Sequence, residues 1–233
     1  MRLEARQISV RFGALAALAS VSLDVQSGER RALIGPNGAG KTTLFNVIAG
    51  ELRPASGSVL LDGRDVTSLP TWRRARMSVG RTFQRSALFP RLSVSENLEL
   101  AVRRGALGGR RRAVPDRLAA AGLSAVAERP AVSLGHGEQR ALEIELALAC
   151  EPRLLLLDEP MAGLSGAERQ AALARLRDLP RSVTLVIVEH DIDAVFAIAE
   201  RITVLDHGVR IADGTPAEVR ADPRVQEVYL GRS

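Results

Sequence analysis

Short apolar blocks separated by turn residues fill the first sixty residues of the chain. These blocks span 3–12, 21–25, 31–35 and 58–63. Their alternating or continuous apolar pattern predicts β-strands, and Asp62-Gly63 is a hairpin-type turn signal. Between the third and fourth blocks, residues 41–52 carry apolar side chains at helical spacing. The pattern therefore predicts a β-rich region that contains one helix.

From about Ser86 to Cys150 the pattern changes to helical segments separated by Gly, Pro and Arg-rich stretches. This change predicts an α-helical insertion. Cys150 lies in the apolar stretch "LALACEP". We therefore expect Cys150 to be a small buried hydrophobe rather than a nucleophile.

Two continuous apolar runs follow, "RLLLLDEP" at 153–160 and "SVTLVIVEH" at 182–190. They are too short for buried helices and are typical of central parallel strands covered on both faces. Helical patterns over 166–179 and 191–202 separate or follow them, and a hairpin turning at Asp206 to Gly208 precedes a short helix. Alternating strands and helices predict an α/β fold with a parallel sheet and right-handed crossovers.

Length and composition fit one large domain, or one domain with an insertion, because 233 residues at 46% hydrophobic can bury a full core. A single cysteine excludes an intrachain disulfide and suits a reducing compartment. No apolar run approaches the roughly 18 residues that span a bilayer, and the first residues lack the apolar block of a signal peptide. We expect a soluble chain that reaches a membrane only through a partner.

The net charge is +5, and residues 103–117 are rich in arginine. That segment contains no aromatic residue to stack on a base, and the whole chain is only 3% aromatic, so a solvated face fits better than a nucleic-acid interface. Lys41 is the only lysine among 32 Lys and Arg residues. Its position therefore requires a chemistry that arginine does not provide.

Residues 35–42, "GPNGAGKT", match G-x-x-x-x-G-K-[ST] between a predicted strand and a predicted helix. The glycines allow backbone N–H groups to face phosphate oxygens, and the helix N-terminus adds partial positive charge. A compact ammonium at Lys41 fits between β- and γ-phosphates, where a planar guanidinium is too large. Thr42 would bind Mg²⁺ through its hydroxyl, and Thr43 would face a phosphate. The alternative is a glycine-rich turn that only caps a helix. The predicted nucleotide-binding residues here are Gly35, Pro36, Asn37, Gly38, Ala39, Gly40, Lys41, Thr42 and Thr43.

Polar groups end the later apolar runs at the same sheet edge. Asp158 suits a magnesium contact and Glu159 suits polarising an attacking water, which predicts hydrolysis rather than binding alone. His190 ends the next run and could donate to a γ-phosphate. The alternatives are an acidic strand end and a structural histidine. His207 lies in the hairpin turn and receives no role, and His136 is expected in a loop before a helix.

Taken together, these motifs resemble those of the nucleotide-binding subunits of ATP-binding cassette (ABC) transporters over nearly the whole chain. The resemblance rests on Walker A "GPNGAGKTT", a Q-loop glutamine at Gln84 in "GRTFQ", a signature-like "LGHGEQ" at 134–139, Walker B "LLLLDEP", a D-loop-like "AGLS" at 162–165, and His190. Within the family the chain is most similar to the ATPase subunits of branched-chain amino acid importers. Segments such as "GRTFQRSALFPRLSVSENLELAV" and the terminal "VYLG" carry that similarity.

The resemblance implies a P-loop NTPase (RecA-like) mixed sheet core with an N-terminal antiparallel β subdomain and an inserted α-helical subdomain. Residues 1–233 would form a single ABC ATPase domain. Its core and antiparallel β subdomain would comprise 1–85 and 151–233, and its helical signature subdomain 86–150.

It also implies that two ATPase subunits, identical or different, close head to tail on ATP and Mg²⁺. Each nucleotide would lie between one chain's phosphate loop and the other chain's signature, which here offers Gly135, Gly137 and Glu138. Gln84 would contact Mg²⁺ and report the γ-phosphate. Phe12 would stack on adenine, although its place in the strand alternation equally suits the core.

Closure would drive integral membrane permease subunits from the cytoplasmic face of the inner membrane, with membrane contact only through the partner and no nucleic acid. The sequence departs from the family pattern at two positions. Gly135 stands where a serine is usual, and a hydrogen bond to a charged group contributes roughly 1.5 to 3 kcal/mol, so we expect a weakened site. Ser165 stands where aspartate is frequent, which puts its contact across the dimer in doubt.

Three alternatives remain. A lipid or lipopolysaccharide exporter would use a similar short cassette. A soluble ABC protein acting on nucleic acid or ribosomes would carry two cassettes or a coiled-coil insertion, and neither occurs here. A P-loop kinase leaves Gln84, the signature and His190 unexplained. The cargo does not touch this subunit, so its identity is not encoded in the motifs.

Overall fold

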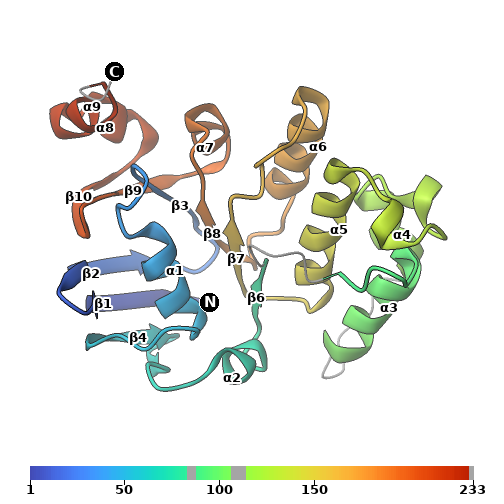
Figure 1. The fold of residues 1–233 in the computed structure, drawn as a ribbon, viewed down its shortest axis with the longest axis horizontal. Coiled ribbons are helices and arrows are strands. Elements are labelled where there is room, and N and C mark those ends of the chain that lie inside the picture. The colour runs from blue at the N-terminus through green and yellow to red at the C-terminus, as the bar shows by residue number, and fades with distance from the viewer. Residues whose placement is uncertain (83–87, 106–113, 231–233) are drawn as a thin grey trace.

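The computed structural model describes residues 1–82, 88–105 and 114–230, which form two β-sheets with helices between and around them (Figure 1). A four-stranded antiparallel sheet has the order β2-β1-β4-β5. Its strands are β1 (Leu3–Phe12), β2 (Leu15–Val25), β4 (Ser56–Leu61) and β5 (Arg64–Asp65). A six-stranded sheet has the order β10-β9-β3-β8-β7-β6 and is parallel except for the β9–β10 hairpin. Its strands are β3 (Arg30–Ile34), β6 (Val79–Arg81), β7 (Leu154–Asp158), β8 (Thr184–Val188), β9 (Arg201–Asp206) and β10 (Val209–Gly214).

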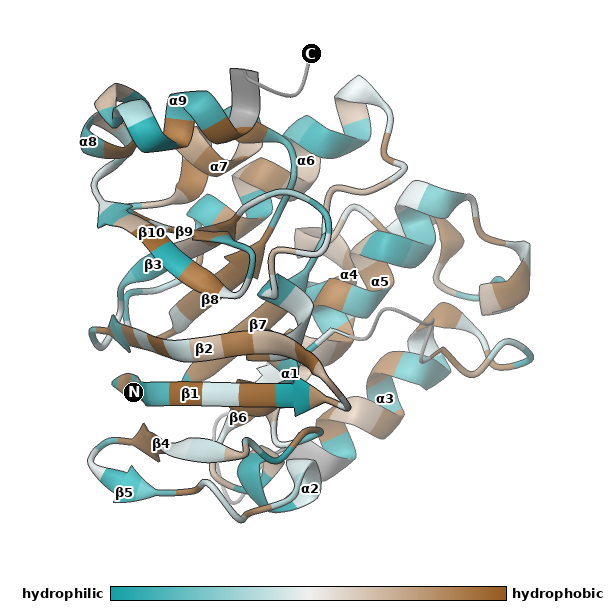
Figure 2. Cartoon of the chain, turned by 60° about the vertical axis from the view of Figure 1, so that its left-hand side comes forward, coloured by the Kyte–Doolittle hydropathy of each residue, from teal (hydrophilic) through white to brown (hydrophobic). Residues whose placement is uncertain are grey.

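Helix α1 (Lys41–Ala49) lies between the two sheets. Its buried side chains, among them Leu44, Phe45 and Ile48, form one apolar cluster with both sheets. Helices α5 (His136–Ala149), α6 (Gly166–Arg177) and α7 (Ile192–Ile198) form a second cluster on the other face of the six-stranded sheet. Strands β7 and β8 are buried over their whole length and are mostly brown in Figure 2, as a doubly covered parallel sheet requires.

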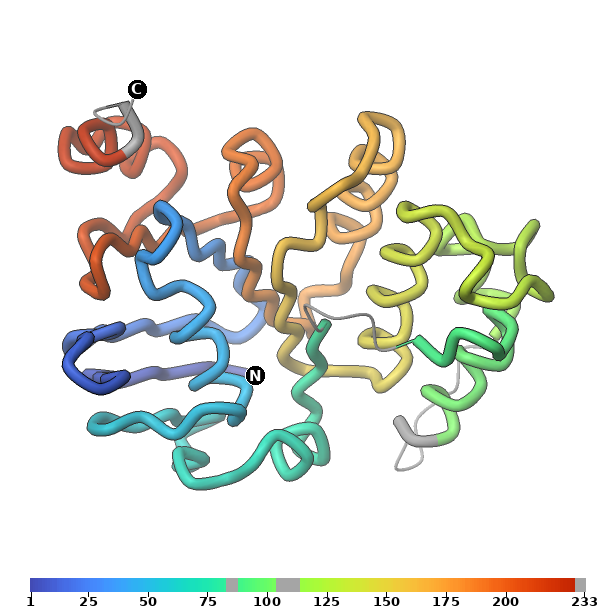
Figure 3. The backbone as a smooth tube through the Cα atoms, in the orientation of Figure 1, coloured from blue at the N-terminus to red at the C-terminus, as the bar shows by residue number. Residues whose placement is uncertain are grey.

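A third apolar cluster lies within the helices that precede β7. These elements are α3 (Val94–Gly105), α4 (Val114–Ala120), α5 and the 3₁₀ turns η1 (Ser124–Val126) and η2 (Ala131–Ser133). The tube in Figure 3 shows this helical group to one side of the sheets, with α5 leading back to β7. Three short helices complete the described elements: α2 (Thr71–Ala75), α8 (Pro216–Ala221) and α9 (Pro223–Leu230).

The fold class expected from the sequence is confirmed, together with the Asp62-Gly63 and Asp206 to Gly208 turns. The predicted strand over 21–25 is the second half of the longer β2, and the short strands β5 and β6 were not predicted. Among the described residues, no helix is both long and apolar enough to cross a bilayer.

Two expectations were wrong. Cys150 is exposed rather than buried, because α5 ends at Ala149 and Cys150 caps the helix where the chain turns away at Glu151, whose φ is 49°. His136 is not in a loop: it is the first residue of α5.

Candidate nucleotide-binding site

The predicted phosphate loop connects the end of β3 to the start of α1. Gly40 caps α1 with φ 100°, and no acidic residue occupies the first turn, so the partial positive charge of this helix end is not offset locally. A Cβ atom on Gly35 would lie 2.1 Å from the carbonyl oxygen of Leu205, so only glycine fits at the start of the loop. The geometry is that of an anion cradle.

Lys41 is 5% exposed and its ammonium lies inside this loop. Its Nζ donates to the carbonyl oxygens of Gly35 at 2.7 Å and Pro36 at 2.9 Å. Burial lowers the Lys41 pKa, while the charges of Glu159 and Asp158 raise it, and burial prevails. The two acids are therefore close enough to act electrostatically on the lysine.

The carboxyl ends of three neighbouring parallel strands carry the predicted polar groups. The phosphate loop follows β3, His190 follows β8, and Asp158 ends β7, in the sheet order β3-β8-β7 (Figure 1). Asp158 is 1% exposed. Glu159 has φ 47°, an uncommon value for a residue with a side chain, and its N–H donates to the carbonyl of Val188. The turn after β7 is thus fixed against β8.

His190 and Glu159 are in direct contact. The His190 Nε2 lies 2.6 Å from the Glu159 Oε1, and both side chains are partly exposed. Beneath them the buried Glu189 carboxylate accepts hydrogen bonds from the backbone N–H groups of Met161 and His190. Burial raises the Glu189 pKa. Glu189 therefore joins the turn after β7 to the turn after β8. It was not predicted, and the only signal for it in the sequence is an acidic residue within an apolar run.

The predicted signature residues lie at the N-terminus of α5. Gly135 is the N-cap residue, and the Glu138 carboxylate accepts its N–H at 2.8 Å. Gly137 is buried, whereas Gly135 and His136 are exposed. In Figure 1 helices α5 and α1 lie on opposite sides of β6 and β7. The structure therefore does not bring the signature residues to the phosphate loop of the same chain.

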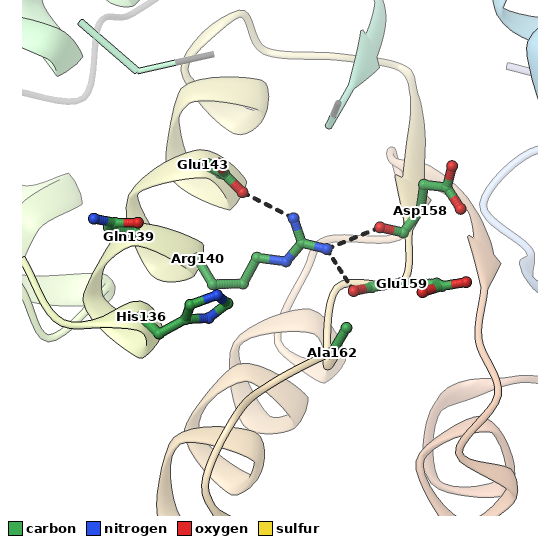
Figure 4. A pocket seen from close by; sticks show the side chains of 7 residues that line it. All are labelled: His136, Gln139, Arg140, Glu143, Asp158, Glu159 and Ala162. Carbon is green, nitrogen blue, oxygen red and sulfur yellow. Dashed lines mark hydrogen bonds and ion pairs between the residues drawn. The ribbon is translucent and has the colours of Figure 1, made fainter. Parts of the chain in front are cut away.

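Arg140 reaches from α5 to the end of β7 and was not predicted. Its guanidinium donates to the carbonyl oxygens of Asp158 at 2.9 Å, Pro160 at 3.2 Å and Glu159. Figure 4 shows it pairing with Glu143 as well. A cavity of about 240 Å³ surrounds it. The cavity is lined by His136, Gln139, Arg140, Glu143, Asp158, Glu159 and Ala162.

Phe12 ends β1 and is 53% exposed, so it does not belong to the core. Its ring is available to a planar ligand. Gln84 lies outside the described residues. Within the described ranges, no group of three or more His, Cys, Asp or Glu side chains is arranged to hold a metal ion. The oxygen donors present, the Thr42 hydroxyl and the Asp158 carboxylate, are of the kind that Mg²⁺ takes together with nucleotide phosphates.

Comparison with known proteins decides the family. Residues 18–162 match the model of the ABC transporter family. The chain belongs to the ABC transporter family. A second model, that of the branched-chain amino acid ATP-binding cassette transporters, matches residues 209–233 of this ABC cassette. The family resemblance inferred from the motifs is therefore confirmed, and the chain is an ATPase.

Curated relatives cover almost the full length of this cassette. The high-affinity branched-chain amino acid transport ATP-binding protein BraF of Pseudomonas aeruginosa is 38% identical, over 99% of this chain and 98% of the relative. The corresponding protein LivG of Escherichia coli is 39% identical, over 97% and 96%. The lipopolysaccharide export system ATP-binding protein LptB of Acidithiobacillus ferridurans is 37% identical, over 91% and 89%.

Solved ABC cassettes share the fold. The ADP conformation of MJ1267, an ATP-binding cassette of an ABC transporter, has a TM-score of 0.87 at 30% identity, covering 99% of both chains. A dimeric post-hydrolysis state of the cassette MJ0796, bound to ADP and Pi, has a TM-score of 0.80 at 28% identity, covering 92% of this chain and 98% of that one. Nucleotide binding and dimer formation are thus features of similar cassettes.

Proposed function

We propose that this chain is the ATP-hydrolysing subunit of an importer for branched-chain amino acids. It would act at the cytoplasmic face of the inner membrane, paired with a second ATPase subunit and docked on integral membrane permease subunits. The full-length similarity to BraF and LivG and the family match at residues 209–233 support this cargo class over lipopolysaccharide export.

One observation carries the proposed chemistry: the phosphate loop, the Glu159–His190 pair and Asp158 follow three adjacent strands. Lys41 and the loop amides would bind the β- and γ-phosphates, with Thr43 facing a phosphate. Glu159 would polarise the attacking water, and His190 would orient Glu159 and donate to the γ-phosphate. Phe12 would stack on the adenine.

Magnesium fits this donor set. Thr42 and Asp158 would hold it, with Gln84 as a further ligand, and bound Mg²⁺ would offset charge on the phosphates. The remaining face of the nucleotide would meet Gly135, Gly137 and Glu138 of the partner subunit's signature, whether that partner is a copy of this chain or a different cassette. The dimeric state of MJ0796 supports such a pairing.

Affinity purification from membranes of the natural host tests the assignment. A tagged Glu159→Gln chain should bind ATP without hydrolysing it and so hold the closed dimer. We expect it to retain a second cassette and an integral membrane permease when Mg²⁺ and ATP are present. A matched Lys41→Ala variant should lose the ATP-dependent cassette pairing.

The cargo is tested separately by uptake of radiolabelled leucine. Cells that carry Lys41→Ala in place of the natural chain should lose uptake. Recovery of the tagged chain without any membrane protein would contradict the transport assignment, whereas normal leucine uptake by the Lys41→Ala cells would contradict the cargo.

A further inference from the structure

The N-terminus of α5 is joined by two reciprocal contacts to the segment that contains the loop before α6 and the first turn of α6. A Cβ atom on Gly137 would lie 2.0 Å from the Glu168 Oε1 and 2.2 Å from its Cδ, so the Glu168 carboxylate lies directly over Gly137. In the opposite direction, the His136 ring lies over Gly163, where a Cβ atom would be 3.1 Å from the ring. Each side chain thus covers a glycine of the other segment.

The Glu168 carboxylate is an anion that lies against the N-terminus of α5. The proposed function places a phosphate, which is another anion, at the same helix end. Its Oε2 accepts the Ser165 N–H at 2.8 Å and the Ser165 hydroxyl at 2.7 Å, which caps α6. These Ser165 hydrogen bonds keep the Glu168 pKa below its usual value, and the charge of His136 and the Gly137 amide add to the effect. Glu168 is therefore ionised at neutral pH, and it covers the Gly137 backbone.

We propose that Glu168 is an internal anion that covers the signature end of α5 in the separated subunit and must move before a partner's nucleotide phosphate binds there. The inference rests on the proposed function, which places that phosphate at Gly137. Two negative groups repel each other at one helix end. Because Gly135 offers no hydroxyl, the Gly137 amide has an increased share in phosphate binding, and Glu168 competes for that position.

Glu168→Gln separates this role from helix capping. The glutamine keeps the size of the side chain and an oxygen that can cap Ser165, but it removes the negative charge. Glu218→Gln is the matched control: Glu218 accepts the Thr215 N–H at 2.7 Å and caps α8 in the same way, and α8 is not part of the signature region. Both variants weaken one capping box, and only the first changes the charge at Gly137.

The first measurement is the ATP dependence of hydrolysis by the membrane complex purified through the tagged chain. We expect Glu168→Gln to lower the KM for ATP by about fivefold, as removal of a competing charge-assisted contact should, with kcat unchanged or higher. Glu218→Gln should leave both parameters unchanged. A KM for Glu168→Gln that is raised, or equal to that of Glu218→Gln, would overturn the inference and leave only a structural role.

The second measurement uses the isolated chain and so does not depend on a partner. Amide hydrogen exchange over residues 135–140 should be faster in Glu168→Gln than in the wild type and unchanged in Glu218→Gln. Equal exchange in all three proteins would show that the Glu168 charge does not hold the Gly137 amide and would also overturn the inference. Failure of the wild-type complex to hydrolyse ATP would instead contradict the proposed function.

Discussion

At the scale of single residues, the lone lysine of the sequence lies buried at the phosphate loop. Its ammonium fits between the Gly35 and Pro36 carbonyls inside a closed loop. The motif predicted that Lys41 belongs to a phosphate loop, because that signal is local, but it did not predict the contacts with the two carbonyls. Phe12 needed the structure: its exposure, not its place in the strand alternation, excludes the core.

Gly135 gives a test at the same scale. Its φ of −65° and ψ of 162° suit any residue, and an added Cβ atom would meet only the Glu138 Oε2, at 3.7 Å. Gly135→Ser should therefore be tolerated, and the added hydroxyl would restore a donor to the partner's γ-phosphate. We expect higher ATPase activity of the assembled complex, by about tenfold or more, since such a bond contributes roughly 1.5 to 3 kcal/mol and about 1.4 kcal/mol is a factor of ten.

The activity is measured at saturating and at limiting ATP. Gly135→Ala is the control, because it adds the Cβ atom without the hydroxyl. Equal activity of the serine and alanine variants would contradict a weakened site at Gly135.

Residues that act through backbone groups were not predicted. Arg140 holds the carbonyls after β7, and Glu189 holds amides in two turns. Hydrophobic periodicity gives no signal for such contacts, because the backbone carbonyl and N–H groups that Arg140 and Glu189 bind are present in nearly every residue type. Cys150 shows that a sequence pattern also fails to locate the end of a helix to within one residue. The apolar stretch around Cys150 predicted burial, but Cys150 lies one residue past the end of α5 and is exposed.

At the scale of elements, the central strands β7 and β8 were predictable, because short continuous apolar segments are typical of parallel strands that are covered on both faces. The ionic links between strands were not. Asp213 on β10 accepts hydrogen bonds from Arg31 on β3 at 2.5 Å, Arg201 at 2.7 Å and Thr203 on β9 at 2.7 Å. Arg31 is almost fully buried. Asp213 therefore joins the hairpin to the strand that carries the phosphate loop.

Asp213→Asn should lower the free energy of unfolding at pH 7 by about 1.5 to 3 kcal/mol, the usual range for hydrogen bonds to charged groups. Burial raises the Asp213 pKa, but the bonds from Arg201 and Thr203 and the charges of Arg31 and Arg201 outweigh it, so the pKa is lower than 3.8. A lowered acid pKa gives stability that is present above pH 3.8 and lost as the pH falls through the folded-state value.

Urea denaturation followed by circular dichroism checks this at pH 7 and near pH 3. The difference between wild type and Asp213→Asn should shrink at the lower pH. Asp222→Asn is the control, because the one ion pair of Asp222 among the described residues is local, with Arg224 two residues away, and does not join separate strands. A pH-independent difference for Asp213→Asn would contradict the electrostatic origin of its effect.

At the scale of the whole molecule, α5 packs on the six-stranded sheet and also belongs to the helical group, and Arg140 is one of its side chains that contact the sheet edge. From α5 it holds the backbone of Asp158, Glu159 and Pro160. Movement of α5 would therefore displace Glu159, the residue proposed to polarise the attacking water. The motifs predicted candidate residues for the chemistry, but not this connection, because it depends on how separate segments pack.

The variant Arg140→Lys tests the contact between Arg140 and the three backbone carbonyls at the end of β7. A lysine keeps the charge but cannot reach all three carbonyls at once. We expect kcat for ATP to fall by about tenfold, since small displacements of a positioned catalytic group are costly, while KM changes by less than about threefold. Steady-state kinetics of the purified complex measure both parameters.

Arg103→Lys is the matched control, because Arg103 lies on α3 of the same helical group and, among the described residues, its one ion pair is with the exposed Glu99. A selective rise of KM in Arg140→Lys, with kcat retained, would show that Arg140 serves binding and not the placement of Glu159.

Backbone hydrogen bonds also connect the phosphate loop to the β9–β10 turn and to β2. The Gly208 N–H in the β9–β10 turn donates to the Ala39 carbonyl, and the Ala19 N–H of β2 donates to the Gly208 carbonyl. Both sheets therefore hold the phosphate loop in shape through backbone hydrogen bonds. Nucleotide capture then costs little ordering entropy, and the slow steps of the cycle should lie in subunit rearrangement rather than in loop folding.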